Sequence, residues 1–509
     1  MTDPQDASFS PAARDDAGPP PPPPAGEPRP ALPPRSLAAR LAILWWLPVL
    51  AICGLLAAGH ATSKGQARTL PPPGEAPSVM LEFAARMDIG LHTIGGAAAA
   101  AGAQPASQQQ VHSPLDRLRY AAVMGEVRGA AAAQEVLDAA QKEIEQRVIP
   151  EARRGEAALP ADAWFVEDDA ARAALLQDVA ALRRIYETGR GADAPLDAAA
   201  RARLVERHGW FAQVALSFGG DASDPFRKAM RAAGVRSVIA VSVAAVAIVL
   251  AGLAGLVLFI VMLVLLAQGR LTSGFKRSAG PLRSMPPGLR GVFLETFALF
   301  MIVFLGASLA AGPLSDLTGL PLRTPILWSV LLVAFWPLVR GAGADAWRAG
   351  LGWHSGRGVM RELAAGVVGY IAGLPLLGVG VCITLVLTVL TRGDAAHPVA
   401  GEFGGQSFWG TLELLLLLTV WAPVVEETFF RGALLAHLRR RWALPLAAVV
   451  SAVLFAIIHP QGVLGVPVVG AIGVNLALIR EWRGSLLACM AGHALNNGFV
   501  GILLVLVMG

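Results

Sequence analysis

The sequence is poor in charged residues and in cysteine. Only 16% of its 509 residues are charged, whereas soluble globular proteins average about 25%. Its three cysteines, Cys53, Cys382 and Cys489, lie inside apolar runs, which argues against a disulfide framework and a cysteine-rich zinc site. The net charge of +5 is not a sign of nucleic-acid binding, because the excess Lys and Arg lies mainly in short loops between apolar runs. These features exclude a soluble enzyme, a disordered scaffold and a nucleic-acid-binding protein.

The sequence is rich in long apolar runs. Hydrophobic residues make up 54% of the chain, and runs of 18 or more apolar residues are typical of membrane-spanning helices. We therefore predict an all-α polytopic membrane protein with about nine transmembrane helices. The predicted spans are residues 41–59, 237–267, 291–312, 324–340, 363–390, 410–438, 442–459, 463–479 and 484–506.

Composition divides the chain into five parts. These are a disordered proline-rich tail (1–36), a signal-anchor helix (37–60), an α-helical soluble domain (61–236), a first membrane region (237–345) and a second membrane region (346–509). In the soluble domain, Ser113 followed by Pro114 is a helix start, and the helical pattern continues to Pro150. A second helix is expected to end near Gly189.

Charge in the short loops predicts the orientation. The loops 268–290, 439–441 and 480–483 are basic and alternate with nearly neutral ones, as the positive-inside rule requires. The N-terminus is then cytoplasmic, and the soluble domain is extracytoplasmic. The Ala-, Arg- and Pro-rich composition indicates a bacterium with GC-rich DNA, and hence its inner (plasma) membrane.

Ionisable residues inside predicted spans are costly and mark candidate functional sites. Such residues gather in the last four spans: Glu426, Glu427, Arg431, His459 and His493. A helix rises about 1.5 Å per residue, so the number of residues from a basic loop gives the depth of a side chain in the membrane. The depths of Glu426, His459 and His493 differ by amounts that helix tilt and partly buried loops can compensate. Two imidazoles and a carboxylate are therefore expected to meet.

Helical spacing assigns different faces to these side chains. Glu427 stands four residues before Arg431, the spacing of an intrahelical ion pair, which leaves Glu426 to face the site. His493 and Asn497 share a helix face and form a plausible donor pair for an oxyanion. Glu426 and His459 suit the binding and deprotonation of a water molecule. Phe455 lies one turn before His459 on the same face.

Other interpretations of the same residues remain open at this point. Polar pairs in a membrane bundle also serve as hydrogen bonds between helices. A transporter with a proton relay would show repeat symmetry between two halves, and none is visible. The zinc-protease motif H-E-x-x-H, the nucleophile motif G-x-S-x-G and a pair of intramembrane aspartates are all absent from the sequence.

Read in order, the residues are Glu426-Glu427-x-x-x-Arg431, Phe455-x-x-x-His459 and His493-x-x-x-Asn497. This pattern resembles the three-motif signature of the type II CAAX prenyl endopeptidase and bacteriocin-processing family, the CPBP or ABI intramembrane proteases. The resemblance covers roughly residues 350–506, within the second membrane region.

The resemblance implies an endopeptidase with a polar cavity among membrane helices. It implies that Glu426 is the general base, that His459 is its partner on the water, and that His493 and Asn497 stabilise the oxyanion. Glu427 and Arg431 would support the site. The family has been described both as metalloproteases and as glutamate proteases, so Glu426, His459 and His493 are candidate zinc ligands. A membrane-anchored peptide or protein is the expected substrate, and a non-catalytic scaffold or immunity protein with this fold is the alternative.

Overall fold

The computed structural model describes most of the chain. It covers residues 42–62, 68–69, 79–102, 104–111, 113–146, 164–165, 169–271, 289–319, 321–391 and 407–508. The predicted proline-rich tail, residues 1–36, lies outside the described residues. Nearly all described elements are helices, so the predicted all-α class is confirmed.

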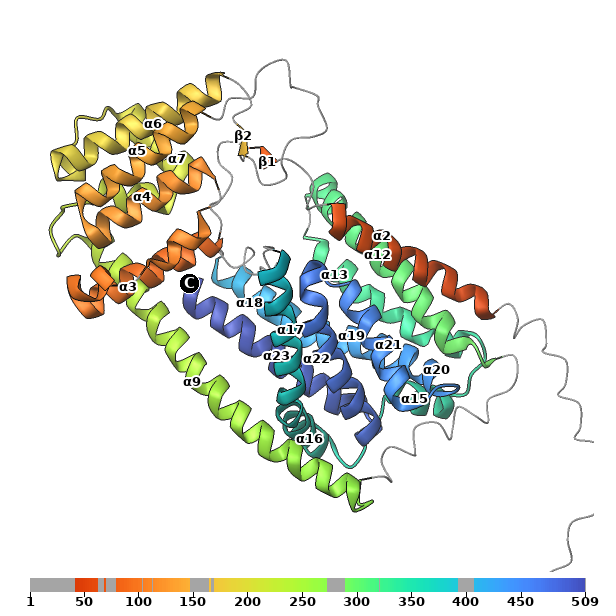
Figure 1. Ribbon diagram of the computed structural model, residues 1–509. Coiled ribbons are helices and arrows are strands. Elements are labelled where there is room, and N and C mark those ends of the chain that lie inside the picture. The colour runs from red at the N-terminus through yellow and green to blue at the C-terminus, as the bar shows by residue number, and fades with distance from the viewer. Residues whose placement is uncertain are drawn as a thin grey trace, which may run out of the picture.

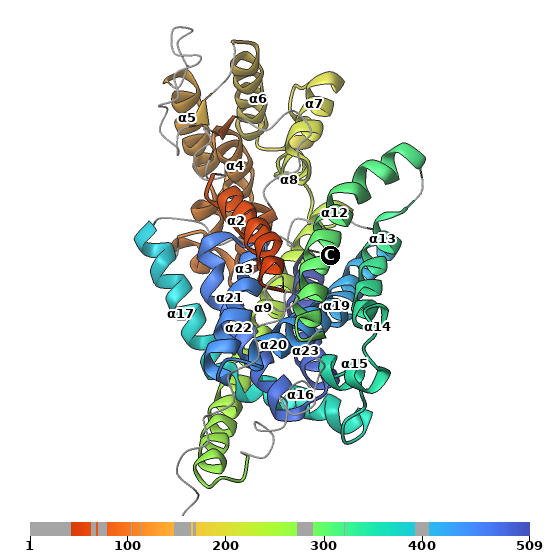
Figure 2. The same ribbon diagram turned by 90° about the vertical axis from the view of Figure 1, so that its right-hand side faces the viewer.

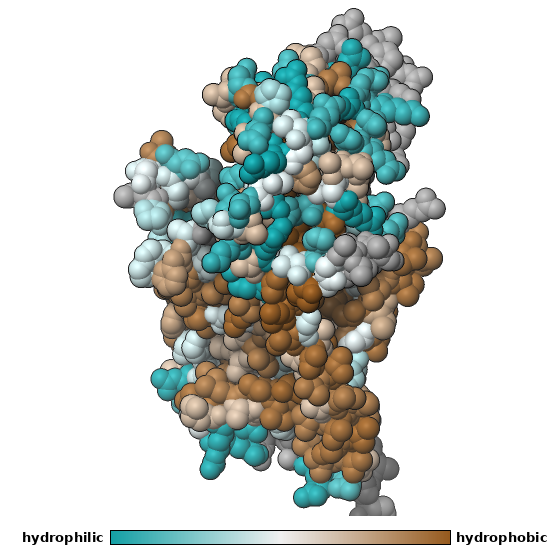
Figure 3. Space-filling view, turned by 90° about the vertical axis from the view of Figure 1, so that its left-hand side faces the viewer, coloured by the Kyte–Doolittle hydropathy of each residue, from teal (hydrophilic) through white to brown (hydrophobic). Residues whose placement is uncertain are grey.

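A group of helices on the polar side of the molecule has its own hydrophobic core (Figures 1 and 3). Two two-residue strands, β1 (Arg68–Thr69) and β2 (Trp164–Phe165), pair in parallel beside it. The helices of this group are α3 (Val79–Gly102), η2 (Ala106–Gln110), α4 (Pro114–Arg128), α5 (Ala130–Gln146), α6 (Asp169–Thr188), η4 (Gly191–Asp193), α7 (Ala198–His208) and α8 (Trp210–Leu216).

The predicted helix start at Ser113 is confirmed. The Ser113 side chain accepts a hydrogen bond from the backbone N–H of Asp116 at 3.0 Å, and Pro114 is the first helical residue. The prediction of one helix to Pro150 is wrong, because α4 ends at Arg128. Gly129 has φ +90°, a backbone conformation that glycine adopts at low cost, and α5 begins immediately after it. The helix expected to end near Gly189 is α6.

A buried polar cluster joins α6 to α7. Asp178 is fully buried and accepts hydrogen bonds from Arg207 at 2.5 Å and from His208 Nε2 at 3.2 Å. Burial alone would raise the pKa of Asp178, but the bonds and charges of His208 and Arg207 together hold that pKa below its usual value. Burial lowers the pKa of His208 against the opposing effect of Asp178. The packing of α6 against α7 therefore depends on the protonation of Asp178 and His208.

Helix α9 (Pro225–Ala267) joins these helices to the membrane bundle. Its first part crosses α3 at two glycines: a Cβ on Gly90 would lie 2.2 Å from the carbonyl oxygen of Gly234. Its second part runs along the apolar band of the molecule, as Figures 1 and 3 show. The predicted span 237–267 is thus the C-terminal part of a 43-residue helix.

The remaining helices form the bundle seen in Figure 2. They are η1 (Ala42–Trp45), α2 (Trp46–Thr62), α12 (Val292–Thr318), α13 (Arg323–Ser329), η6 (Val330–Phe335), α14 (Trp336–Val339), α15 (Ala344–Leu351), α16 (Val359–Ala372), α17 (Leu374–Thr391), α18 (Phe408–Leu416), η8 (Leu417–Trp421), α19 (Ala422–Glu427), η9 (Thr428–Leu434), α20 (Leu435–Arg439), α21 (Leu444–Ile457), α22 (Gly462–Arg483) and α23 (Leu486–Met508).

Six helices in the described part of the chain are long and apolar enough to cross a membrane. Three further predicted spans fall on shorter apolar helices, so the number nine stays a prediction. The predicted single span 363–390 is wrong, because the chain breaks at Gly373 between α16 and α17. A Cβ on Gly373 would lie 2.1 Å from the Asn475 side chain, so this turn is packed against α22.

Stacked aromatic rings form the core of the bundle. Phe300 of α12 stacks on Phe429 of η9 with ring centroids 4.2 Å apart, and Phe430 packs edge-on against Phe455 of α21 at 5.1 Å. All four rings are almost fully buried. Close aromatic packing of this kind fixes the position of the segment that carries Glu426 and Glu427.

Candidate active site

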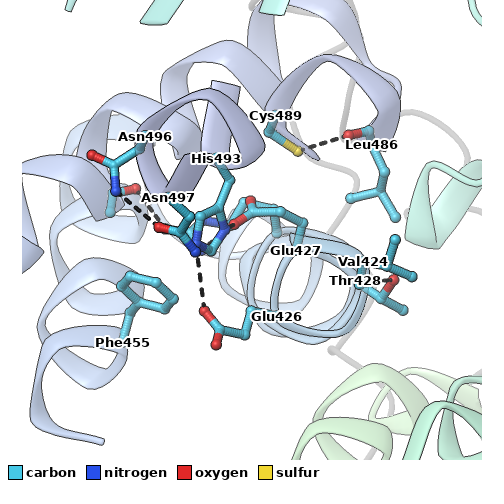
Figure 4. A network of polar contacts seen from close by, with 12 residues as sticks. Val424, Glu426, Glu427, Thr428, Phe455, Leu486, Cys489, His493, Asn496 and Asn497 are labelled. Carbon is cyan, nitrogen blue, oxygen red and sulfur yellow. Dashed lines mark hydrogen bonds and ion pairs between the residues drawn. The ribbon is translucent and has the colours of Figure 1, made fainter. Parts of the chain in front are cut away.

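The stretch from α18 to α20 is one long helix with two wider turns. Leu417–Trp421 and Thr428–Leu434 are π-helical, and the short α-helical segment Ala422–Glu427 lies between them. Wider turns of this kind interrupt helices rarely and are frequent at functional sites. Here they flank the two carboxylates, whose side chains leave the helix in different directions (Figure 4).

Glu427 is the centre of a fully buried ion cluster. Its Oε1 accepts hydrogen bonds from Arg431 at 2.9 Å and from His493 Nδ1 at 2.8 Å. Arg431 also donates to the carbonyl oxygen of Gly473 at 3.1 Å, and its guanidinium lies 4.3 Å from the centre of the Phe455 ring. The predicted ion pair of Glu427 with Arg431 is therefore confirmed, and it ties α19 and η9 to α21, α22 and α23.

Glu426 faces both imidazoles. Its Oε2 lies 3.7 Å from Nε2 of His459 and 3.8 Å from Nε2 of His493, as Figure 4 shows for His493. Both distances are too long for direct hydrogen bonds. Oε2 is buried and has no hydrogen-bond partner. A buried carboxylate oxygen costs free energy unless a donor reaches it, so this atom is the natural acceptor for a proton of a reacting molecule.

The remaining ring nitrogens of the two histidines are already engaged. Nδ1 of His459 donates to the carbonyl oxygen of Phe455 at 2.6 Å, and Nδ1 of His493 donates to Glu427. A neutral His459 ring therefore carries its proton on Nδ1 and turns the lone pair of Nε2 toward Glu426. The Phe455 ring packs against the His459 ring at 4.3 Å and holds it in place.

His493 lies between the two carboxylates, with Nδ1 on Glu427 and Nε2 facing Glu426.

Asn497 belongs to a hydrogen-bonded chain that the sequence motifs do not reveal. Its amide nitrogen donates to the carbonyl oxygen of Leu418 at 2.9 Å, and its Oδ1 accepts from Asn496 at 2.9 Å. The Tyr370 hydroxyl donates to Oδ1 of Asn496 at 2.6 Å. The only signal in the sequence is a pair of consecutive asparagines in an apolar helix.

The predicted residues are thus brought together from three segments that are distant in the sequence. Glu426, Glu427, Arg431, Phe455, His459, His493 and Asn497 all take part in this arrangement. Gly473, Leu418, Asn496 and Tyr370 were not predicted, because two of them contribute backbone carbonyls and the other two lie outside the spaced motifs.

The donor types of Glu426, His459 and His493 fit zinc, and their spacing is wider than that of ligands on a bound ion. Two ligands bound tetrahedrally to zinc at about 2.0–2.1 Å lie roughly 3.3 Å apart. The distances from Glu426 to His459 and His493 are 3.7 and 3.8 Å. Within the described ranges, no group of three His, Cys, Asp or Glu side chains is arranged to hold a metal ion.

Fold and site together define an all-α integral membrane protein with a partly buried Glu–His–Asn cluster. Residues 408–499 match the family model described as type II CAAX prenyl endopeptidase Rce1-like. The resemblance predicted from the motifs is confirmed by this match. No curated protein and no solved structure matches the chain. The matched segment contains every motif residue from Glu426 to Asn497.

Proposed function

We propose that the protein is an intramembrane endopeptidase that hydrolyses peptide bonds of membrane-anchored peptides or proteins by means of an activated water. The observation that carries this proposal is the buried Oε2 of Glu426, which lacks a hydrogen-bond partner and faces the Nε2 atoms of two imidazoles. The family match of residues 408–499 supports the same class of reaction.

In the first step, Glu426 takes a proton from water while the water oxygen attacks the carbonyl carbon of the scissile bond. The neutral ring of His459 accepts a hydrogen bond from the same water at Nε2 and so orients it. The carbonyl oxygen becomes an oxyanion, which accepts hydrogen bonds from Nε2–H of His493 and from the Asn497 amide. Glu427, Arg431 and Phe455 hold these groups in place.

In the second step, the C–N bond breaks and the electron pair goes to the leaving nitrogen. Glu426 returns the proton that it took from water to this nitrogen, so the products are a carboxylic acid and an amine. No proton or electron remains unaccounted for. His459 and His493 regain their starting hydrogen bonds, and the site is ready for a second water.

Comparative peptidomics of membranes tests the proposal. A deletion strain would be complemented with wild type, Glu426→Gln or His459→Ala at matched expression. General-base catalysis contributes about 10²–10⁴-fold, so the products should depend on both residues. Glu413→Gln is the control, because Glu413 is a carboxylate of the same long helix that contacts Thr324 instead of the site.

If both variants yield every product that wild type yields, the protease proposal is wrong. The chain would then act as a membrane scaffold or immunity protein. Inhibition by a chelator together with stoichiometric zinc in the purified protein would instead replace the glutamate mechanism by a metal-dependent one.

We further infer an orientation in the bacterial inner membrane with a cytoplasmic N-terminus. The basic segments 439–441 and 480–483 lie at the end of the bundle opposite the helical domain (Figure 1), which supports the positive-inside assignment. The helical domain would then meet substrates outside the cytoplasm. Labelling of single cysteines at Ser223 and at Arg441 with a membrane-impermeant maleimide tests this, because only the former should react in intact cells.

A further inference from the structure

Asn497 stabilises an oxyanion only if its amide is turned the right way. The amide has a nitrogen that donates and an oxygen that accepts, and the two ends have nearly the same shape. If the oxygen faced the reacting carbonyl, it would repel the negative charge that develops there. The orientation of this amide therefore decides whether Asn497 helps or hinders the reaction, and the fold must fix it.

The carbonyl oxygen of Leu418 sets the direction of the whole hydrogen-bonded chain. A backbone carbonyl only accepts, so Asn497 must present its nitrogen to Leu418 and its oxygen to Asn496. Asn496 must then donate from its own nitrogen, which turns its oxygen toward Tyr370. The Tyr370 hydroxyl completes the chain as a donor. Each hydrogen-bonding group in the chain from Tyr370 through Asn496 and Asn497 to Leu418 thus has one possible orientation.

One N–H of the Asn497 amide is left for the substrate. The amide nitrogen carries two hydrogens, and Leu418 accepts only one of them. Asn497 stands one helical turn after His493, so both side chains lie on the same face of α23, as Figure 4 shows. The free N–H and the Nε2 atom of His493 are therefore neighbouring donors for one oxyanion.

The residue at the far end of the hydrogen-bonded chain, Tyr370, comes from outside the matched family segment. Tyr370 belongs to α16, which packs along α23, and its side chain is buried with 8% exposure. Its backbone carbonyl accepts a hydrogen bond from Asn475 of α22 at 3.3 Å. Asn475 itself fills the space beside Gly373. Tyr370 is therefore held by two helices before it reaches Asn496.

We propose that Tyr370 and Asn496 are positioning residues that orient the Asn497 amide with its nitrogen toward the oxyanion. They act through Asn497 and do not touch the substrate. This inference rests on the proposed hydrolytic function. It makes α16, which lies outside the motifs, part of the machinery that stabilises the transition state.

Steady-state kinetics of the full-length protein in detergent test the inference. The probe is a quenched fluorescent peptide that ends in a farnesylated CAAX sequence. Tyr370→Phe keeps the ring and removes only the donor, and Asn496→Leu replaces the amide by an apolar group of similar size. Loss of one neutral hydrogen bond should lower kcat about three- to tenfold. KM should stay unchanged, because the interaction acts only in the transition state.

A double-mutant cycle separates positioning from a general effect on the fold. In the background of Asn497→Ala, Tyr370→Phe should have no further effect on kcat, because nothing remains to be oriented. Tyr186→Phe is the matched control. Tyr186 is also a buried tyrosine, with its hydroxyl 3.5 Å from the carbonyl oxygen of Ala121 in the helical domain, and its variant should leave kcat unchanged.

Three results would overturn the inference. If Tyr370→Phe retains the kcat of wild type while Glu426→Gln is inactive, the positioning role is wrong and the protease function stands. If Tyr370→Phe slows wild type and Asn497→Ala by the same factor, Tyr370 acts independently of Asn497. If wild type and Glu426→Gln cleave the probe equally, the proposed function fails and the positioning role fails with it.

Discussion

Removal of the buried positive charge of Arg431 should destabilise the protein strongly. The side chains of Arg431 and Glu427 both have 0% exposure, so water cannot solvate the carboxylate that Arg431→Met would leave behind. The variant also loses the hydrogen bond to Gly473 and the contact with the Phe455 ring. Breaking a buried pair by removing one partner costs about 3–5 kcal/mol. We expect a loss of this size in the free energy of unfolding.

Removing both charges should restore most of the stability but not the activity. In Glu427→Gln/Arg431→Met no unpaired charge is buried, and the glutamine oxygen still accepts a hydrogen bond from His493. The double variant should therefore lie within about 1–2 kcal/mol of wild type. Turnover should nevertheless fall about 100-fold, because the ion pair that aligns the helix of Glu426 with His493 is gone.

Unfolding in mixed micelles with rising dodecyl sulfate, followed by circular dichroism, measures the stability of each variant. The buried pair Glu362 and Arg483 is the matched control, with side-chain exposures of 0% and 9% and distances of 2.7 and 2.8 Å. Its single and double variants should show the same pattern in stability without loss of turnover by the folded protein. The reasoning is refuted if Arg431→Met is as stable as wild type, or if the double variant is no more stable than Arg431→Met.

Three further predictions concern other parts of the fold. Gly255→Ala should destabilise the contact of α9 with the bundle by about 1–3 kcal/mol, because the new Cβ would lie 2.4 Å from a backbone oxygen. Gly252→Ala is the control, because a Cβ there would meet nothing within 4 Å. This control should be neutral or stabilising in the same micelle titration. Because the pKa of His208 is lowered in the folded protein, neutral His208 stabilises the fold fully above pH 6.5, and this contribution is lost as the pH falls. The contribution of Asp178, whose pKa is also lowered, is lost only below pH 3.8. The amide protection factors of α6 and α7, which correct exchange rates for the pH dependence of intrinsic exchange, should therefore be lower at pH 5 than at pH 7 in wild type but not in His208→Gln. Equal protection factors in wild type would contradict the assignment. Ser113→Ala should cost about 1 kcal/mol through loss of the helix cap, which appears as faster exchange at the start of α4 alone.

Local patterns in the sequence were sufficient for several elements. The serine–proline pair at the start of α4 works through contacts within one turn, so it was predicted from adjacent residues. The spacing of Glu427 and Arg431 predicted their ion pair for the same reason. The helix to Pro150 and the span 363–390 were predicted too long. In both, a single glycine ends the helix: Gly129 through its backbone conformation and Gly373 through its packing on Asn475.

The candidate active site was likewise predicted only in part. Spaced motifs identified the side chains from Glu426 to Asn497, because residues one helical turn apart share a face. Motifs do not report which carbonyls a side chain reaches, so the roles of Gly473 and Leu418 in holding Arg431 and Asn497 were not predicted. The two π-helical turns beside Glu426 were not predicted either, because their wider geometry depends on packing against α12, α21 and α23.

The sequence by itself determined the class of protein, the apolar runs, the ionisable residues within them and the family signature. These follow from residue type and from spacing along one helix. Only the tertiary structure showed that His493 bonds to Glu427 through Nδ1 while its Nε2 faces Glu426, and it alone brought Tyr370 into contact with Asn496. The physical reason is that hydrogen bonds between helices depend on how the helices pack, and packing brings together residues more than 100 positions apart in the chain.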